Sequence, residues 1–190
     1  MSRNTRSSAA DCVRTLVVAC ALALLTVPAL AQASAPPPLP AAIAAMSPTL
    51  TVRGGGELTF LGIAVYDGWY WSAAPGWPQS GPYALDLHYH RSLDGARIAA
   101  RSVDEIAKLG FGSAAERRRW GEAMTRLFPD VKRGDRITGV NVGGGVVRYF
   151  LNGRAIGDID DPGFADAFFG IWLHPQTSQA DFRQKLLGTP

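Results

Sequence analysis

Three strand-like segments in the second half of the chain are separated by turns of only two or three residues. The segments are 136–142, 146–151 and 154–159, and the turns between them are the glycine triplet 143–145 and Asn152-Gly153. Asn-Gly between two β-rich segments is the strongest short signal for a hairpin. Because a parallel crossover needs a dozen or more residues, strands joined by such turns pair antiparallel. The sequence therefore predicts an antiparallel sheet.

The remaining elements are two further strand-like segments and four helices. An apolar run over 58–71 predicts one long strand covered on both faces, whereas 83–90 alternates between an apolar and a solvated face. The helices are marked by start or stop signals at Gly110, the capping box from Ser113 to Glu116, Asp161-Pro162, and Ser178 with Gly188. The predicted fold class is therefore α+β, a mainly antiparallel sheet with helices packed on one face.

The first 33 residues have the pattern of a secretory signal peptide. Three arginines precede an apolar run over 15–30, and the segment ends in the small residues Ala31-Gln32-Ala33. The run is about 16 residues long and leads into a proline-rich stretch, so we expect cleavage and no membrane span in the released chain. A protein exported in this way is periplasmic or secreted.

Removal of 1–33 changes the cysteine content and the charge. Both cysteines, Cys12 and Cys20, lie in this segment, so the released chain would form no disulfide. Three of the 19 basic and one of the 16 acidic residues are lost as well, which leaves 16 basic against 15 acidic. A nearly neutral domain lacks the positive field that nucleic-acid binding requires.

Residues 34–48 are rich in proline and alanine and have no apolar periodicity, which predicts an extended linker. Folding is expected to begin near Thr49, so that 49–190 form one domain with a sizeable core. The glycine triplets 54–56 and 143–145 precede strands and not helices, so they predict turns and no phosphate-binding loop. No motif predicts a cofactor.

A spaced set of short motifs from Thr49 to Gly188 resembles the chalcone isomerase-like family, and in particular its exported bacterial members. Each motif is short and weak, and the set together is fairly specific. The motifs are Leu61-Gly62-Ile63-Ala64-Val65-Tyr66-Asp67, Leu93-Asp94-Gly95, Lys108-Leu109-Gly110, Phe128-Pro129-Asp130, Tyr149-Phe150-Leu151-Asn152-Gly153, Asp161-Pro162-Gly163-Phe164-Ala165 and Phe168-Phe169-Gly170-Ile171-Trp172-Leu173.

This resemblance implies an open sheet with a ligand cleft between the sheet and the helices. In the plant enzymes of the family the cleft cyclises a chalcone to a flavanone, and in related non-enzymatic members it holds a fatty acid. The family's strand arginine has no counterpart in 57–61, and its tyrosine after the following turn is replaced by Ile98. An isoleucine stabilises no phenolate or enolate. We therefore predict no catalytic residue, with Arg97 and Arg101 as substitute anion-binding groups if they turn inward.

Aromatic residues and histidines supply the remaining candidates. Tyr66 and Trp69 belong to the aromatic segment and are candidates for lining an apolar ligand site, although core packing is the common use of such residues. His88 and His90 share one face of a strand and would chelate a metal only with a third ligand, such as His174 or Asp86. Without a firm third ligand, we predict that they are solvated and hold no metal.

Three functions are compatible with these patterns. The favoured one is non-catalytic binding of a small apolar or amphiphilic ligand, such as a lipid, by an exported domain. The alternative is an isomerase of the chalcone-flavanone type that acts on a phenolic enone with differently placed anchors. A structural or partner-binding module is favoured instead if the cleft is filled by the protein's own side chains.

Overall fold

Six strands and five helices make up the part of the chain that the structure, a computed structural model, describes, which is residues 36–79 and 81–189. In chain order they are α1 (Ala41–Met46), β1 (Thr51–Phe60), β2 (Ile63–Ser72), β3 (Tyr83–Tyr89), α2 (Gly95–Lys108), α3 (Ala114–Leu127), β4 (Arg136–Gly143), β5 (Val146–Leu151), β6 (Arg154–Asp160), α4 (Phe164–Leu173) and α5 (Ala180–Leu187). The strands form one sheet whose spatial order follows the chain, and each neighbouring pair is antiparallel. The predicted α+β class is confirmed.

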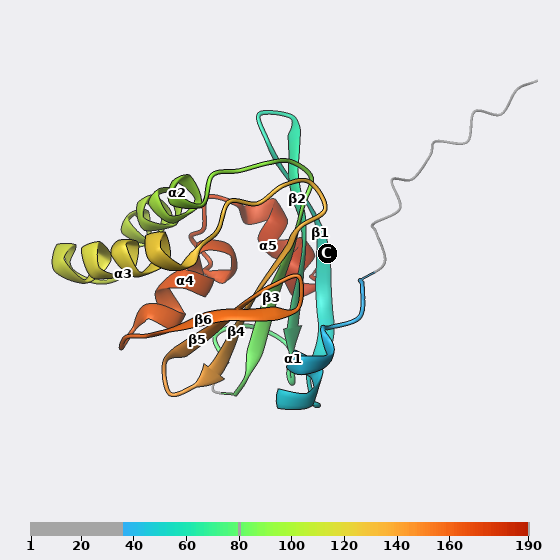
Figure 1. The fold of residues 1–190 in the computed structure, drawn as a ribbon. Coiled ribbons are helices and arrows are strands. Elements are labelled where there is room, and N and C mark those ends of the chain that lie inside the picture. Colours follow the sequence, from blue (N-terminus) through green and yellow to red (C-terminus); the bar gives the residue numbers. More distant parts are fainter. Residues whose placement is uncertain (1–35, 80, 190) are drawn as a thin grey trace, which may run out of the picture. The chain divides into compact units, whose positions relative to one another are not determined.

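The four longer helices, α2 to α5, lie on one side of the sheet (Figure 1). The main hydrophobic core fills the space between the two layers and includes the fully buried Tyr70, Tyr149, Phe164 and Phe169. The described residues form one compact unit with its own core. Within this part of the chain, no helix has the length and apolar character needed to cross a membrane.

The apolar segment 58–71, which we expected to be one strand, is a hairpin. Strand β1 ends at Phe60 and β2 begins at Ile63, with Leu61 and Gly62 as a two-residue turn. Both turn residues have positive φ, 50° at Leu61 and 76° at Gly62. Leucine is not a typical turn residue, and here it lies within an apolar run. The turn was therefore not predicted from the sequence. The hairpin projects beyond the rest of the sheet, at the top of Figure 1.

The glycine triplet 54–56 is part of β1 and not the turn that we predicted, whereas Gly144 and Gly145 do form one. The reason is the close approach of α5. A Cβ atom on Gly54 would lie 2.1 Å from the carbonyl oxygen of Lys185, and one on Gly56 would lie 2.8 Å from the Lys185 side chain. Glycine here lets a helix contact the strand backbone.

The expected linker 34–48 contains a helix in its described part. In α1, Ile43 is fully buried and packs with Leu50, Ala84, Val140 and Phe150 as a second hydrophobic cluster. This cluster covers part of the face of β3 that we predicted to be solvated. The pattern was missed because a six-residue helix has room for only one buried position. The predicted signal segment 1–33 lies outside the described residues.

Helices α2 and α3 form an excursion between the neighbouring strands β3 and β4. Leu93 and Val131 close its two ends by a short antiparallel bridge, and the Asp130 carboxylate accepts a hydrogen bond from the Gly95 backbone N–H at 2.9 Å. A Cβ atom on Gly95 would lie 2.3 Å from the Phe128 carbonyl oxygen, so only glycine fits. These contacts fix the start of α2 above the sheet.

Candidate ligand-binding site

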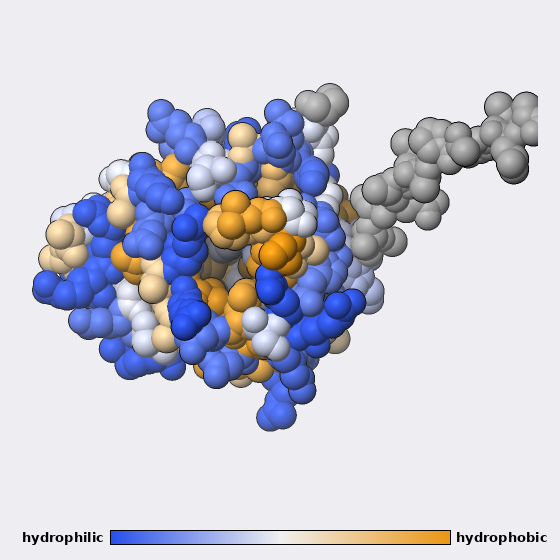
Figure 2. All heavy atoms as spheres, turned by 90° about the horizontal axis from the view of Figure 1, so that it is seen from above, coloured by the Kyte–Doolittle hydropathy of each residue, from blue (hydrophilic) through white to orange (hydrophobic). Residues whose placement is uncertain are grey.

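A cavity of about 480 Å³ lies between the sheet and α2, under the β1–β2 hairpin. Its walls are mostly apolar and come from β1, β2, β3, α2 and α4. Figure 2 looks onto this end of the molecule and shows apolar side chains gathered around a hollow, with hydrophilic side chains outside them. The volume falls within the range of about 300–1,000 Å³ that is typical of small-molecule sites. The cleft is therefore not filled by the protein's own side chains.

The sheet side of the cavity is formed by residues that alternate along β1, β2 and β3. Leu58, Tyr66 and Tyr89 face the helices, because every second side chain of a strand points to the same side. The Tyr66 ring meets the Tyr89 ring edge-on at 5.7 Å and the Phe182 ring of α5 at 5.9 Å. Helix α5 thereby packs against a residue of the cavity wall.

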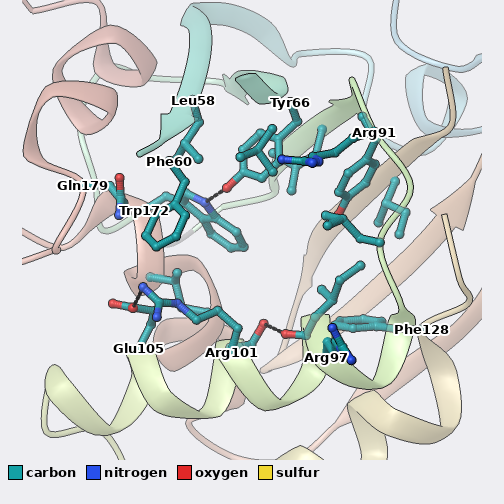
Figure 3. A pocket seen from close by; sticks show the side chains of 18 of the residues that line it. Leu58, Phe60, Tyr66, Arg91, Arg97, Arg101, Glu105, Phe128, Trp172 and Gln179 are labelled. Carbon is teal, nitrogen blue, oxygen red and sulfur yellow. Dashed lines mark hydrogen bonds and ion pairs between the residues drawn. The ribbon is translucent and has the colours of Figure 1, made fainter. Parts of the chain in front are cut away.

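Helix α4 supplies the wall opposite the hairpin. The Trp172 indole N–H donates a hydrogen bond of 2.8 Å to the Tyr66 hydroxyl, which ties α4 to β2 inside the cavity (Figure 3). Burial raises the pKa of Tyr66, and the hydrogen bond from Trp172 and the charge of Arg101 oppose this only in part. Burial also raises the pKa of Tyr89. Both phenols are thus neutral at physiological pH and act as hydrogen-bonding groups, not as bases.

One side of helix α2, which is mostly polar, faces the cavity. Asp94 caps the helix by accepting the Arg97 backbone N–H at 2.9 Å, and the residues that line the cavity then follow at helical spacing. They are Arg97, Ile98, Arg101, Ser102 and Glu105. In Figure 3, Arg101 and Glu105 of this helix lie across the cavity from Phe60, Tyr66 and Trp172.

The cavity mouth is narrowed where β1 meets α2. The Arg101 guanidinium lies 5.9 Å from the centre of the Phe60 ring, a cation–π contact. Glu105, only 6% exposed, binds Arg101 at 2.6 Å, Lys108 at 2.9 Å and the Ser178 hydroxyl at 2.7 Å. Burial raises the pKa of Glu105, but hydrogen bonds from Lys108 and Ser178 and the nearby positive charges outweigh it and hold this pKa below its usual range. Arg101 therefore has an ion-pair partner, which it shares with Lys108.

Two further guanidinium groups at the cavity have no such partner. Arg91, from the loop after β3, and Arg97 both line the cavity, and no ion pair involves either of them within the described chain. The Asp94 carboxylate beside them is engaged by the helix N-terminus. An apolar cavity with uncompensated arginines at its entrance favours an anionic head on an apolar body.

The structure brings together three of the four residues that we predicted for ligand binding. Tyr66, Arg97 and Arg101 all line the cavity. Trp69 does not, because it lies on the opposite face of the sheet, where its ring meets His88 edge-on at 4.9 Å. Alternation along β2 places Trp69 and Tyr66 on opposite faces of the sheet, and only the Tyr66 face borders the cavity.

Other lining residues were missed. Arg91 has no sequence signal because it sits in a loop, and Glu105 and Trp172 belong to helices that read as amphipathic packing. Tyr89 was assigned to the apolar face of its strand, which is the cavity face. Groups able to stabilise negative charge do line the cavity, among them the guanidinium of Arg91 and the phenols of Tyr66 and Tyr89.

The histidines lie away from this cavity. His88 Nε2 is 3.3 Å from Asp86 Oδ2, and His90 Nε2 is 3.2 Å from Asp67 Oδ2. His174 ends α4 and packs against Trp77 and Phe111, so it is not a third ligand for the other two histidines. Both histidines are partly buried, against the prediction of a solvated pair. Ligand atoms of Glu57, Asp67 and His90 do lie within 4.8 Å of one another.

Comparisons with known proteins agree with this geometry. Residues 74–188 match a family model described as chalcone isomerase-like, which confirms the resemblance seen in the motifs. A Haemophilus influenzae protein described as uncharacterized is 28% identical over 108 residues, which are 56% of this chain and 52% of that protein. The chain therefore spans about half the length of this curated relative.

A solved structure has the same fold. The fatty-acid binding protein of Arabidopsis thaliana superposes with a TM-score of 0.57 at 14% sequence identity, covering 73% of this chain and 87% of that one. At this level of identity the likeness concerns the fold.

Proposed function

Because this chain belongs to the chalcone isomerase-like family, we propose that its cavity binds one amphiphilic molecule, with an apolar body and a negatively charged head, such as a lipid carboxylate. The observation that carries the proposal is the combination of apolar walls with the guanidinium groups of Arg91 and Arg97, which have no ion-pair partner among residues 36–79 and 81–189. The structural likeness to a fatty-acid binding protein supports the same class of ligand.

The geometry assigns a part to each region of the site. Leu58, Val65, Phe168 and Ile171 would enclose the apolar chain, and its burial would supply most of the binding free energy. The head would lie at the mouth, where Arg91 and Arg97 offer charge-assisted hydrogen bonds. Arg101 contributes less because Glu105 already occupies it.

Direct binding tests this proposal. Palmitate should bind the purified chain and hexadecanol, which has no charge, should bind more weakly, as measured by isothermal titration calorimetry. Organic extraction followed by mass spectrometry should also release a co-purified anionic amphiphile. Equal affinity for the two probes would remove the anionic head from the proposal, and binding of neither would remove the proposal itself.

A variant that fills the cavity supplies the matched comparison. Ile98→Trp places a large ring in the cavity and should abolish palmitate binding. Ala100→Trp places the same ring on the exposed side of α2 and should leave binding intact. Loss of binding in both variants would point to a damaged helix and not to an occupied cavity, and circular dichroism distinguishes these outcomes.

A second candidate function is isomerisation of a phenolic enone. The observation in its favour is that Arg91, Tyr66 and Tyr89 line one cavity, which offers a cation and neutral phenols to a developing oxyanion. A hydroxylated chalcone followed by absorbance should then be converted faster than in buffer, and Tyr89→Phe should slow the conversion. A rate equal to that in buffer would exclude this activity for that substrate.

We also propose that the protein acts outside the cytoplasm, on the signal-peptide pattern of residues 1–33. In a bacterial host, the full chain should appear in the periplasmic or secreted fraction with Ser34 as its first residue. Fractionation followed by N-terminal sequencing measures both. An uncleaved chain in the cytoplasmic fraction would contradict this location.

A further inference from the structure

The tip of the β1–β2 hairpin exposes three large apolar side chains at the rim of the cavity. Phe60 is 52% exposed, Leu61 86% and Ile63 52%. The other exposed large apolar residues of the described chain are Met46 and Val52, near the opposite end of β1. Monomeric proteins seldom gather exposed apolar side chains at one projecting point without a binding role.

The backbone at this tip is also unusual for its sequence. Leu61 and Gly62 both have positive φ, as in the two-residue hairpin turns that favour Asn-Gly. Leucine is disfavoured in the left-handed region and gains no burial here to offset that cost. Neither local conformation nor core packing accounts for a leucine at this position. An external contact would account for it.

The charges around the tip indicate what that contact is. Arg91 and Arg97 lie at the same cavity mouth without ion-pair partners in the described chain, and Arg101 packs over Phe60. The nearby carboxylates of Asp94 and Glu105 are engaged in a helix cap and in ion pairs. Apolar side chains beside free cations complement an anionic lipid surface. A stable protein interface would need about 800 Å² on each partner, more than one turn supplies.

We propose that the hairpin tip inserts into the headgroup region of a phospholipid bilayer that contains anionic lipid, with Arg91 and Arg97 against the headgroups. Docked in this way, the cavity mouth faces the bilayer, and an amphiphile passes between them without crossing water. The passage of the amphiphile depends on the function proposed above, whereas the docking itself does not.

Vesicle flotation tests the docking. The chain from Ser34 onward contains both hydrophobic clusters and lacks the apolar run of residues 15–30. It should float with vesicles of phosphatidylcholine and phosphatidylglycerol, and much less with phosphatidylcholine alone or in high salt. Equal flotation with neutral and anionic vesicles would overturn the role given to the arginines.

The tip variant is Leu61→Asn with Ile63→Thr, and its matched control is Met46→Gln with Val52→Thr. Asparagine suits the turn and threonine suits the strand, so the tip variant should keep its melting temperature. Its affinity for anionic vesicles should fall by about tenfold or more, since two inserted apolar side chains are lost. The control should bind like the unaltered chain. A tip variant that floats as well as the control would overturn the proposal.

Hydrogen exchange locates the contact independently of flotation. Anionic vesicles should slow amide exchange over residues 59–64 and leave the turn at 143–145 unchanged. Protection elsewhere without protection of the tip would also overturn the docking proposal. Palmitate titration without vesicles is a separate measurement, so a failure of ligand binding is distinguishable from a failure of membrane docking.

Discussion

The arginines on the two sides of the sheet differ in whether a carboxylate pairs with them. On the face away from α2 to α5, the Arg136 side chain donates two hydrogen bonds, of 2.7 and 2.6 Å, to the fully buried carboxylate of Asp86. Thr138 adds a third at 2.8 Å, and Arg136 also reaches the Pro38 carbonyl oxygen. On the cavity face, Arg91 and Arg97 meet no carboxylate among the described residues.

This difference separates a structural use of arginine from a binding use. Burial raises the pKa of Asp86, but its interactions with His88 and Arg136 outweigh burial and hold this pKa below its usual range, so the carboxylate is ionised and paired with Arg136. A guanidinium paired in this way has little left to offer a ligand. The cavity arginines retain their hydrogen-bonding capacity, which under the proposed function would serve an anionic ligand.

The largest effect is expected for the free energy of unfolding when the Asp86 network is broken. Asp86→Asn leaves Arg136 without its counter-charge and should lower the free energy of unfolding by about 3 kcal/mol, the low end for breaking a buried pair. Urea denaturation measures it. Asp158→Asn, which breaks the exposed pair with Arg148, should cost much less. Similar losses in the two variants would contradict the structural role given to the Asp86 network.

Removal of a cavity arginine should affect ligand affinity and not stability. Arg91→Ala and Arg97→Ala should each weaken palmitate binding by about tenfold, the value of one charge-assisted hydrogen bond, and leave hexadecanol binding unchanged. Calorimetric titration measures both ligands. Arg126→Ala, an exposed arginine of α3 outside the cavity, is the control. Unchanged palmitate affinity would remove the altered arginine from the site.

Glu105 lies on the cavity face, but it is already ion-paired. Its substitution should therefore lower stability, as substitution of the paired Asp86 on the opposite face should. Glu105→Gln should lower stability by about 1 kcal/mol at pH 7. Because the folded pKa of Glu105 lies below the unfolded value of about 4.3, this contribution is present above that pH and is lost as the pH falls through the folded pKa. Melting temperatures across this range should therefore converge in acid. A constant difference would show that charge is not involved.

The smallest effect is expected at Trp69. Its side chain lies on the face away from the cavity, so Trp69→Phe should change palmitate affinity by no more than about twofold, within the effect expected of a distant site. The same titration measures it. A larger loss would mean that the ligand contacts both faces of the sheet edge, and the comparison between the faces would fail.

Most of the fold followed from local signals in the sequence. The Asn152-Gly153 turn, the capping box at Ser113 and the short connections all predicted elements that the structure contains. Helix α1 was missed, and errors also arose at β1 and β2, because Leu61 forms a turn without the chemistry of a turn residue and Gly54 and Gly56 let α5 pack against a strand. The close approach of α5, which the pattern does not show, decided the positions of these glycines.

The candidate site was predictable only in part, for the same reason. Tyr66 and the arginines of α2 were found from the chain, whereas Arg91 and Trp172 join them from a loop and a distant helix. The sequence by itself determined the antiparallel sheet, the existence of the four longer helices and the apolar character of the inner face, because these depend on contacts between near neighbours. Only the tertiary structure decided which arginines are paired, since ion pairing depends on distances between segments that are far apart in the chain.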